Sequence, residues 1–176
     1  MGFLARIPRP RLRPARPRRW RVRPVPALVT AIVLAAGVAV AGWYADRAAD
    51  RRDAAVRQAL ATAPAAAKAI FSYDYRTFDE SVANARTFTT GAFADEYAQT
   101  TATLKQTATK QQAVVLAEVT STGVVTATAD RVELLVYLNQ YRRNVTTAGE
   151  KVDQNRVVLT LERVDGDWKV TRATAV

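Results

Sequence analysis

The sequence predicts an α+β fold: an N-terminal transmembrane helix, then three helices packed on a curved four-stranded antiparallel sheet. Three observations support this prediction. An uncharged, apolar run occupies residues 25–44. Apolar residues at helical spacing follow the run, and from residue 113 onward apolar and polar side chains alternate, as in a half-buried strand. Helices first and consecutive strands last are typical of an α+β domain.

The chain begins with a basic tail, residues 1–24. It holds nine arginines and no acidic residue, and six of the seven prolines lie in the first 26 positions. Because proline disfavours helix, we expect the tail to be extended or disordered. The net charge is +10, but the chain from residue 25 onward has 17 basic against 16 acidic residues and is only +1. The charge therefore does not indicate a nucleic-acid-binding domain.

Residues 25–44 predict a single transmembrane helix, because twenty helical residues span about 30 Å, the thickness of a hydrocarbon core. The neighbouring arginines predict a cytoplasmic N-terminus, an extracytoplasmic C-terminal domain in the cytoplasmic (inner) membrane, and contact between the tail and anionic lipid headgroups. Binding of a cytoplasmic partner or of nucleic acid by the tail is an alternative. The arginines of this topology signal are Arg16, Arg18, Arg19, Arg21 and Arg23.

A cleaved signal peptide is the alternative to a retained anchor. Ala39-Val40-Ala41 has the small-x-small form of a cleavage site. Trp43 and Tyr44 lie at the far end of the run, where the aromatic belt of an anchor is expected, and favour retention.

Small residues recur at every fourth position of the run and define a candidate helix-association face, which would also suit a homo-oligomer. Since eight of the twenty residues are Ala or Gly, composition alone could also produce such a stripe. The residues are Ala27, Ala31, Ala35 and Ala39.

Helical patterns continue beyond the anchor. Residues 45–63 predict a stalk, and Pro64 predicts a kink or break at the start of an extracytoplasmic domain, residues 64–176. Helices are expected at about 65–73, at 77–86 after a capping-box sequence, and at 90–112. One helix face is predicted to hold Val56, Leu60, Ala63, Ala67 and Ile70.

Four strands are expected to follow, within residues 113–125, 132–138, 157–161 and 168–170. Asp165-Gly166 predicts a two-residue hairpin turn before the last strand. Consecutive strands joined by short links must be antiparallel.

The residue types exclude much catalytic chemistry. Cysteine and histidine are absent, so thiol nucleophiles, disulfides and histidine acid–base catalysis are excluded. Neighbouring carboxylates such as Asp79-Glu80 lie in predicted helices and point in different directions. Lys68 and Ser72 share a helical spacing, which by itself is a weak signal for a nucleophile. We therefore expect no catalytic, metal or cofactor site, and a protein that is not an enzyme.

Aromatic residues form the densest cluster in the chain. They predict either a core whose hydroxyls reach the surface, or a pocket or partner surface. Phe88 belongs to this cluster too. The residues singled out for a pocket or partner surface are Phe71, Tyr73, Tyr75, Phe78, Phe93 and Tyr97, with Tyr137 and Tyr141 on the second strand.

The segment IFSYDYRTF at residues 70–78, followed by an acid-bearing helix and F-x-x-x-Y from Phe93 to Tyr97, resembles actinobacterial Mce-associated membrane proteins. The single anchor and the closing VDGDWKV hairpin at residues 164–170 are similar to that family too. The resemblance covers about residues 25–176. It implies a cone-shaped domain, nuclear transport factor two-like or cystatin-like, outside the cytoplasmic membrane. It also implies an accessory, non-catalytic role beside the Mce lipid-import machinery.

The sequence thus predicts a single-pass accessory or scaffold protein that associates with and stabilises a Mce-type lipid import complex. Its expected partners are the membrane and transporter subunits or related membrane proteins, and no nucleic acid. Two alternatives stay open. One is a lipid- or small-molecule-binding envelope domain that uses the aromatic cluster, and the other is a scaffold resembling the inner-membrane component of type IV secretion systems.

Overall fold

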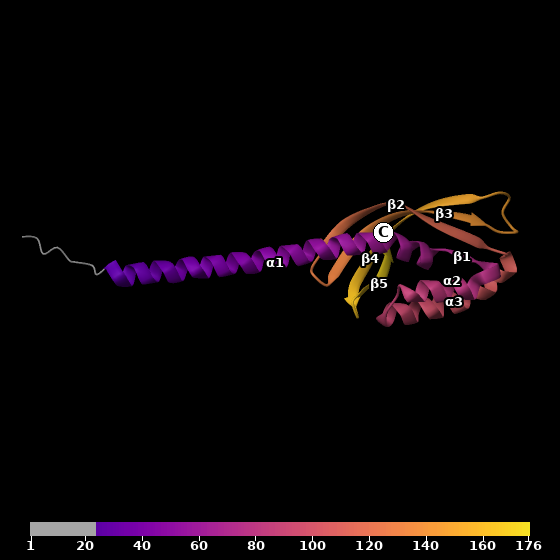
Figure 1. Ribbon diagram of the computed structural model, residues 1–176. Coiled ribbons are helices and arrows are strands. Elements are labelled where there is room, and N and C mark those ends of the chain that lie inside the picture. The colour runs from indigo at the N-terminus through magenta and orange to yellow at the C-terminus, as the bar shows by residue number, and fades with distance from the viewer. Residues whose placement is uncertain (1–23) are drawn as a thin grey trace, which may run out of the picture. The chain divides into compact units, whose positions relative to one another are not determined.

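A computed structural model describes residues 24–176 (Figure 1). The chain divides into two units, residues 1–42 and 43–176. The described part of the first unit is helical, and the second unit is an α+β domain. The arginines of the predicted topology signal, from Arg16 to Arg23, lie outside the described residues.

Helix α1, Pro24–Phe71, is 48 residues long and includes the predicted anchor, the predicted stalk and the predicted first helix of the domain. The predicted break at Pro64 is wrong, because the helix continues through this residue. Pro64 lies on the exposed side of α1, while Ala63 and Ala66 beside it are fully buried. Packing of these neighbouring turns offsets the backbone hydrogen bond that proline cannot donate.

The first part of α1 is long and apolar enough to cross a membrane. In the helical segment that starts at Leu28, the most apolar 18-residue window has a mean hydropathy of 2.0, and none of that window is buried. Large side chains such as Leu34 and Val38 are exposed along it. Among the described residues, this is the one helix with these properties.

The remaining elements follow α1 in the order shown in Figure 1. They are β1 (Tyr73–Asp74), the 3-10 helix η1 (Tyr75–Thr77), α2 (Phe78–Thr87), α3 (Gly91–Gln111), β2 (Val114–Ala127), β3 (Arg131–Arg143), β4 (Lys151–Val164) and β5 (Asp167–Ala175).

The sheet has five antiparallel strands in the order β1-β2-β3-β4-β5. The predicted number of four is wrong because β1 was not expected. It pairs only Tyr73 with Val115 and Asp74 with Val114, too short a strand for its alternation to be visible in the sequence. The Asp165-Gly166 turn is confirmed, since both residues have the positive φ that such turns require.

The core lies between α1 and one face of the sheet. The largest fully buried side chains belong to β3, β4 and β5, and small residues of α1 face them. In the predicted helix face, Ala63, Ala67 and Ile70 are buried, whereas Val56 and Leu60 are only half-buried. Alanines thus occupy the middle of the buried face, because a helix with small side chains can approach a sheet of leucines and valines closely. The buried residues of α1 are Ala55, Ala59, Ala63, Ala66, Ala67, Ala69 and Ile70.

Candidate functional site

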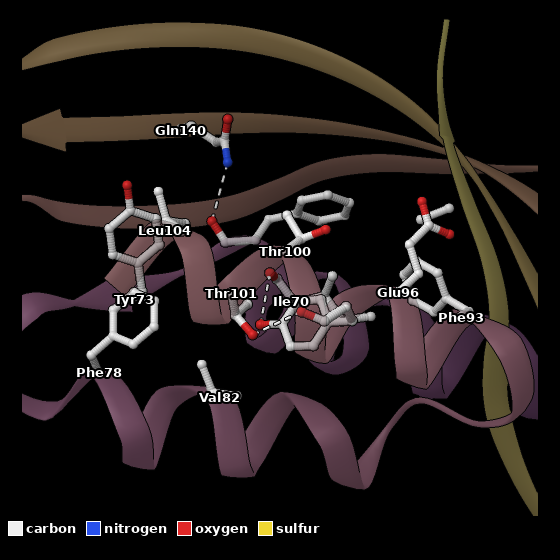
Figure 2. A pocket seen from close by; sticks show the side chains of 13 residues that line it. Ile70, Tyr73, Phe78, Val82, Phe93, Glu96, Thr100, Thr101, Leu104 and Gln140 are labelled. Atoms are coloured by element: carbon white, nitrogen blue, oxygen red, sulfur yellow. Dashed lines mark hydrogen bonds between the residues drawn. The ribbon is translucent and has the colours of Figure 1, made fainter. Parts of the chain in front are cut away.

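A cavity of about 320 Å³ lies among the end of α1, helices α2 and α3, and strands β3 and β5 (Figure 2). Most of its lining is apolar. Helix α3 contributes the longest row of lining side chains, at the three- and four-residue spacing of one helix face. The lining residues are Ile70, Phe71, Tyr73, Phe78, Val82, Phe93, Glu96, Tyr97, Thr100, Thr101, Leu104, Gln140 and Ala173.

Five of the eight aromatic residues singled out in the sequence line this cavity. They are Phe71, Tyr73, Phe78, Phe93 and Tyr97. The rings of Tyr73 and Phe78 meet edge to face with centroids 5.5 Å apart, and those of Phe93 and Tyr97 lie 6.4 Å apart. The cluster from the sequence is therefore a real spatial group along the end of α1, α2 and α3.

Tyr75, Tyr137 and Tyr141 do not line the cavity. Successive side chains of a strand point to opposite faces, so both β3 tyrosines lie on the face opposite the buried Leu138. Gln140 shares the face of Leu138 and enters the cavity in their place. The alternation of apolar residues along β3 carried the signal that could have found Gln140.

Two polar side chains that line the cavity donate hydrogen bonds to the last carbonyls of α1. The Tyr97 hydroxyl donates a hydrogen bond to the carbonyl of Ile70 at 3.4 Å, and Gln140 Nε2 donates to the carbonyl of Phe71 at 3.1 Å (Figure 2). Asn155 Nδ2 donates to Gln140 Oε1 at 2.7 Å and fixes the orientation of that amide. The last carbonyls of a helix lack partners within it, so these contacts are structural ones.

The polar residues between α1 and α2 also bond to the backbone. The Ala117 N–H donates to Ser72 Oγ at 2.9 Å, where it extends the short pairing of β1 with β2. The Arg76 N–H donates to Asp74 Oδ1 at 2.9 Å, which caps η1. The side-chain hydrogen bond from Arg76 also lowers the pKa of Asp74. The Ser-Tyr-Asp-Tyr segment, residues 72–75, therefore holds in place the connection between α1 and the edge strand β1.

The cavity carries little charge. Glu96 is its one charged lining residue, and it lies on the exposed side of α3. Burial raises the pKa of Tyr97 to about 12. Burial also raises the pKa of Tyr73, although the Arg142 guanidinium opposes this shift. Both phenols are consequently neutral near pH 7 and act as hydrogen-bonding groups on apolar rings.

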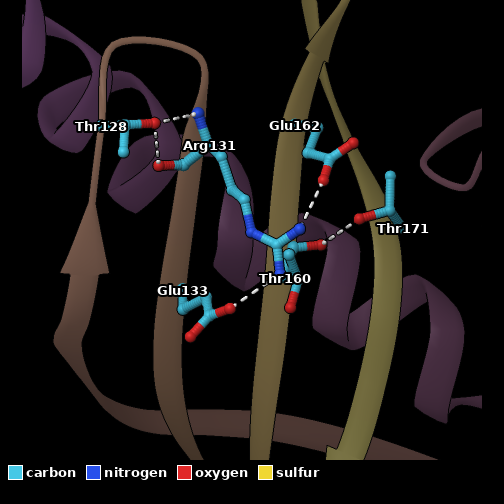
Figure 3. Close-up of polar contacts among 6 residues, drawn as sticks. All are labelled: Thr128, Arg131, Glu133, Thr160, Glu162 and Thr171. Carbon is cyan, nitrogen blue, oxygen red and sulfur yellow. Dashed lines mark hydrogen bonds and ion pairs between the residues drawn. The ribbon is translucent and has the colours of Figure 1, made fainter.

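A second cluster of polar side chains lies on the face of the sheet opposite the cavity (Figure 3). Arg131 forms ion pairs with Glu162 at 2.9 Å and with Glu133 at 2.8 Å. The hydrogen bond from Arg131 lowers the pKa of Glu133. Thr171 Oγ1 donates to the carbonyl of Thr160 at 3.4 Å. The Arg131–Glu162 ion pair joins β3 to β4, and the Thr171 hydrogen bond joins β4 to β5, so these contacts link neighbouring strands of the sheet.

The proposed helix-association face lies in the apolar part of α1. Ala31, Ala35 and Ala39 are exposed there, and the side chain of Ala27 lies outside the described residues. Their role in association stays a prediction. Among residues 24–176 no cluster of three or more Asp and Glu side chains could hold a metal ion.

Comparison with known proteins identifies relatives and a similar fold. The sequence matches no protein-family model. An IcmL-like type IV secretion system protein from Legionella pneumophila has a similar structure, with a TM-score of 0.54 and 18% identity over 65% of this chain and 88% of that chain. The uncharacterized proteins Rv1362c and MT1407, from two strains of Mycobacterium tuberculosis, are each 30% identical over 165 residues, which cover 89% of this chain and 75% of theirs. The chain therefore belongs to the family of the mycobacterial proteins Rv1362c and MT1407.

Proposed function

We propose that this protein is a single-pass membrane accessory protein, not an enzyme, that associates with and stabilises a Mce-type lipid import complex. The observation that carries the proposal is that the two parts of α1 have different surroundings. Its first part is an exposed apolar segment of membrane-spanning length, and its last part lies in the core of the folded domain. A protein built in this way holds a folded domain to a membrane without an intervening loop.

The contacts of the polar side chains near the end of α1 support a non-catalytic role. Tyr97, Gln140 and Ser72 each bond to a backbone group at the junction of α1 with the sheet. Side chains engaged in this way hold the fold and are not positioned to move protons on a substrate. The resemblance of the 70–78 segment to Mce-associated proteins supports the choice of partner.

The proposed topology places the arginine tail in the cytoplasm, against anionic lipid headgroups, and the domain outside the membrane. The aromatic residues after the apolar segment support a retained anchor. Trp43 and Tyr44 meet edge to face with ring centroids 5.1 Å apart, and the Arg47 guanidinium lies 4.0 Å from the centroid of the Trp43 ring. Such a group of aromatic rings and a cation suits the boundary between lipid and water.

Affinity capture tests the partner. The tagged full chain is solubilised gently from native membranes, and co-purifying proteins are identified by mass spectrometry. We expect transporter subunits to be enriched. A parallel capture through a tagged transporter subunit checks that the transporter survives solubilisation. Recovery of the chain alone beside an intact transporter contradicts the proposal.

A second candidate function is the binding of a lipid or small molecule. The cavity of about 320 Å³ with its five aromatic side chains favours it. Mass spectrometry of lipids extracted from the purified chain tests it, and a stoichiometric apolar ligand is expected. The likeness to the type IV secretion protein is one of fold, and it adds no separate support for a secretion role.

A further inference from the structure

The apolar core of the domain is divided into two clusters, and the cavity takes lining residues from both. Ile70, Phe93 and Tyr97 belong to the main cluster with α1 and the sheet. Phe78 and Leu104 belong to a smaller cluster at the other end of α2 and α3. A main core with a smaller satellite cluster beside it is a common arrangement in a domain. A ligand in the cavity would join the two clusters into one apolar interior.

The cavity is elongated. Its lining on α3 runs from Phe93 to Leu104, which at the rise of an α-helix corresponds to about 16 Å. Figure 2 shows Phe93 and Glu96 at one end and Tyr73 and Phe78 at the other. A volume of about 320 Å³ spread over this length is narrow. A linear hydrocarbon chain therefore fits it better than a compact ring system does.

The charge of the lining residues distinguishes linear ligands with an anionic head group from those with an uncharged one. Glu96 brings a negative charge to one end, and none of the lining residues is basic. Arg142 is close enough to Tyr73 to affect its pKa, but it does not line the cavity and is ion-paired with Asp153. A fatty-acid carboxylate would be repelled by Glu96 and find no cation in the lining. A neutral hydroxyl could instead donate a hydrogen bond to Glu96 or bond to Thr100.

We propose that this cavity binds one uncharged, single-chain amphiphile, such as a fatty alcohol or a monoacylglycerol. Its hydrocarbon chain lies along Tyr97 and Leu104, and its hydroxyl head lies at Glu96 and Thr100. The inference rests on the second candidate function, ligand binding, and is independent of association with a transporter.

Photo-crosslinking of the full chain in phospholipid vesicles tests this inference. Two probes are used, a dodecanol and a dodecanoate that carry the same diazirine in the chain, and labelled peptides are mapped by mass spectrometry. We expect the alcohol to label α3 between Phe93 and Leu104 at least five-fold more than the carboxylate does. Labelling of the apolar part of α1 reports how much of each probe enters the membrane and normalises the comparison.

Two pairs of variants, each with a matched control, separate the possible causes of labelling. Val82→Trp fills the cavity from α2 and is expected to abolish labelling of α3, whereas Val125→Trp, an exposed site on β2, leaves it unchanged. Glu96→Gln is expected to raise labelling by the carboxylate to that of the alcohol. Asp95→Asn, which changes the neighbouring exposed carboxylate outside the lining, keeps the difference. Thermal unfolding of each variant confirms that it is folded.

Two results overturn the inference. Absence of α3 labelling beside normal α1 labelling shows that the cavity takes no such chain, while the capture experiment still decides the transporter role. Equal or stronger α3 labelling by the carboxylate in the unmodified chain shows that ligands enter but that Glu96 does not select for an uncharged head.

Discussion

The indole N–H of Trp168, in β5, donates a hydrogen bond to the side-chain oxygen of Gln58, in α1, at 3.0 Å. Arg163, in β4, donates to the same oxygen at 2.6 Å. Trp168 is buried, so its N–H has little access to water. One amide oxygen on the long helix therefore holds both strands of the last hairpin.

Gln58→Ala is expected to destabilise the domain by about 1–3 kcal/mol, because it leaves the buried indole N–H without a partner. Chemical unfolding of the full chain, followed by circular dichroism, measures the change. Gln99→Ala, an exposed glutamine on α3, is the control and should change stability by less than about 0.5 kcal/mol. Equal stability of the two variants would show that the Gln58 contacts contribute nothing.

Ala59→Leu is expected to destabilise the domain by about 1–3 kcal/mol or more, because Ala59 is fully buried between α1 and the sheet and a larger side chain would separate them. Ala61→Leu, on the exposed side of the same helix, is the matched control and should be nearly neutral. Thermal unfolding of both variants tests this. A tolerated leucine at position 59 would mean that the helix does not lie closely on the sheet.

Pro64→Ala is expected to stabilise the domain, by up to about 3 kcal/mol, since it restores a backbone donor within a helix that already continues through this position. The same unfolding measurement applies. Thr62→Ala, one half-turn earlier, should have a smaller effect. A loss of stability in Pro64→Ala would indicate that the ring makes favourable contacts that outweigh the missing hydrogen bond.

Stability is expected to fall at alkaline pH. Burial raises the pKa of Tyr97 from 10.0 to about 12, so between these values the unfolded chain releases the phenolic proton while the folded chain keeps it. The unfolded state then binds fewer protons, and stability contributed by this group is present below pH 10 and lost as pH rises toward 12. Denaturant unfolding at several pH values measures the slope. Tyr97→Phe should reduce this slope.

A charge in the apolar part of α1 is expected to prevent stable membrane insertion. Val33 is exposed within that segment, and arginine at the centre of a membrane helix costs about 2.5–3.5 kcal/mol on insertion scales. Carbonate washing of membranes should release the Val33→Arg variant but retain the unmodified chain and Val125→Arg, a change on β2. Release of the unmodified chain would contradict the anchor.

Local patterns in the sequence predicted most of the fold. The apolar run, the alternation from residue 113 and the Asp165-Gly166 turn each depend on neighbouring residues, and each was found in the structure. The continuity of α1 through Pro64 depends instead on packing against distant strands, which no local pattern contains. Strand β1 was missed for the same reason, because two residues become a strand only through their partners on β2.

The candidate site was predicted in part. Phe93 and Tyr97 were found because helical spacing places them on one side of α3. Tyr137 and Tyr141 were grouped with them by residue type, although the strand alternation places their side chains on the other face. The same alternation places Gln140 on the inner face of β3, but its hydrogen bond to the end of α1 joins residues 69 apart and appears in no local pattern.

The buried, alanine-rich face of α1, within residues 55–70, has a consequence for the order of folding. Residues 55–70 are made before the side chains that cover them, which come from β3, β4 and β5 and include Val170. The buried face of the helix thus has no complete partner until β5 has been made. Contacts so distant in the sequence close slowly.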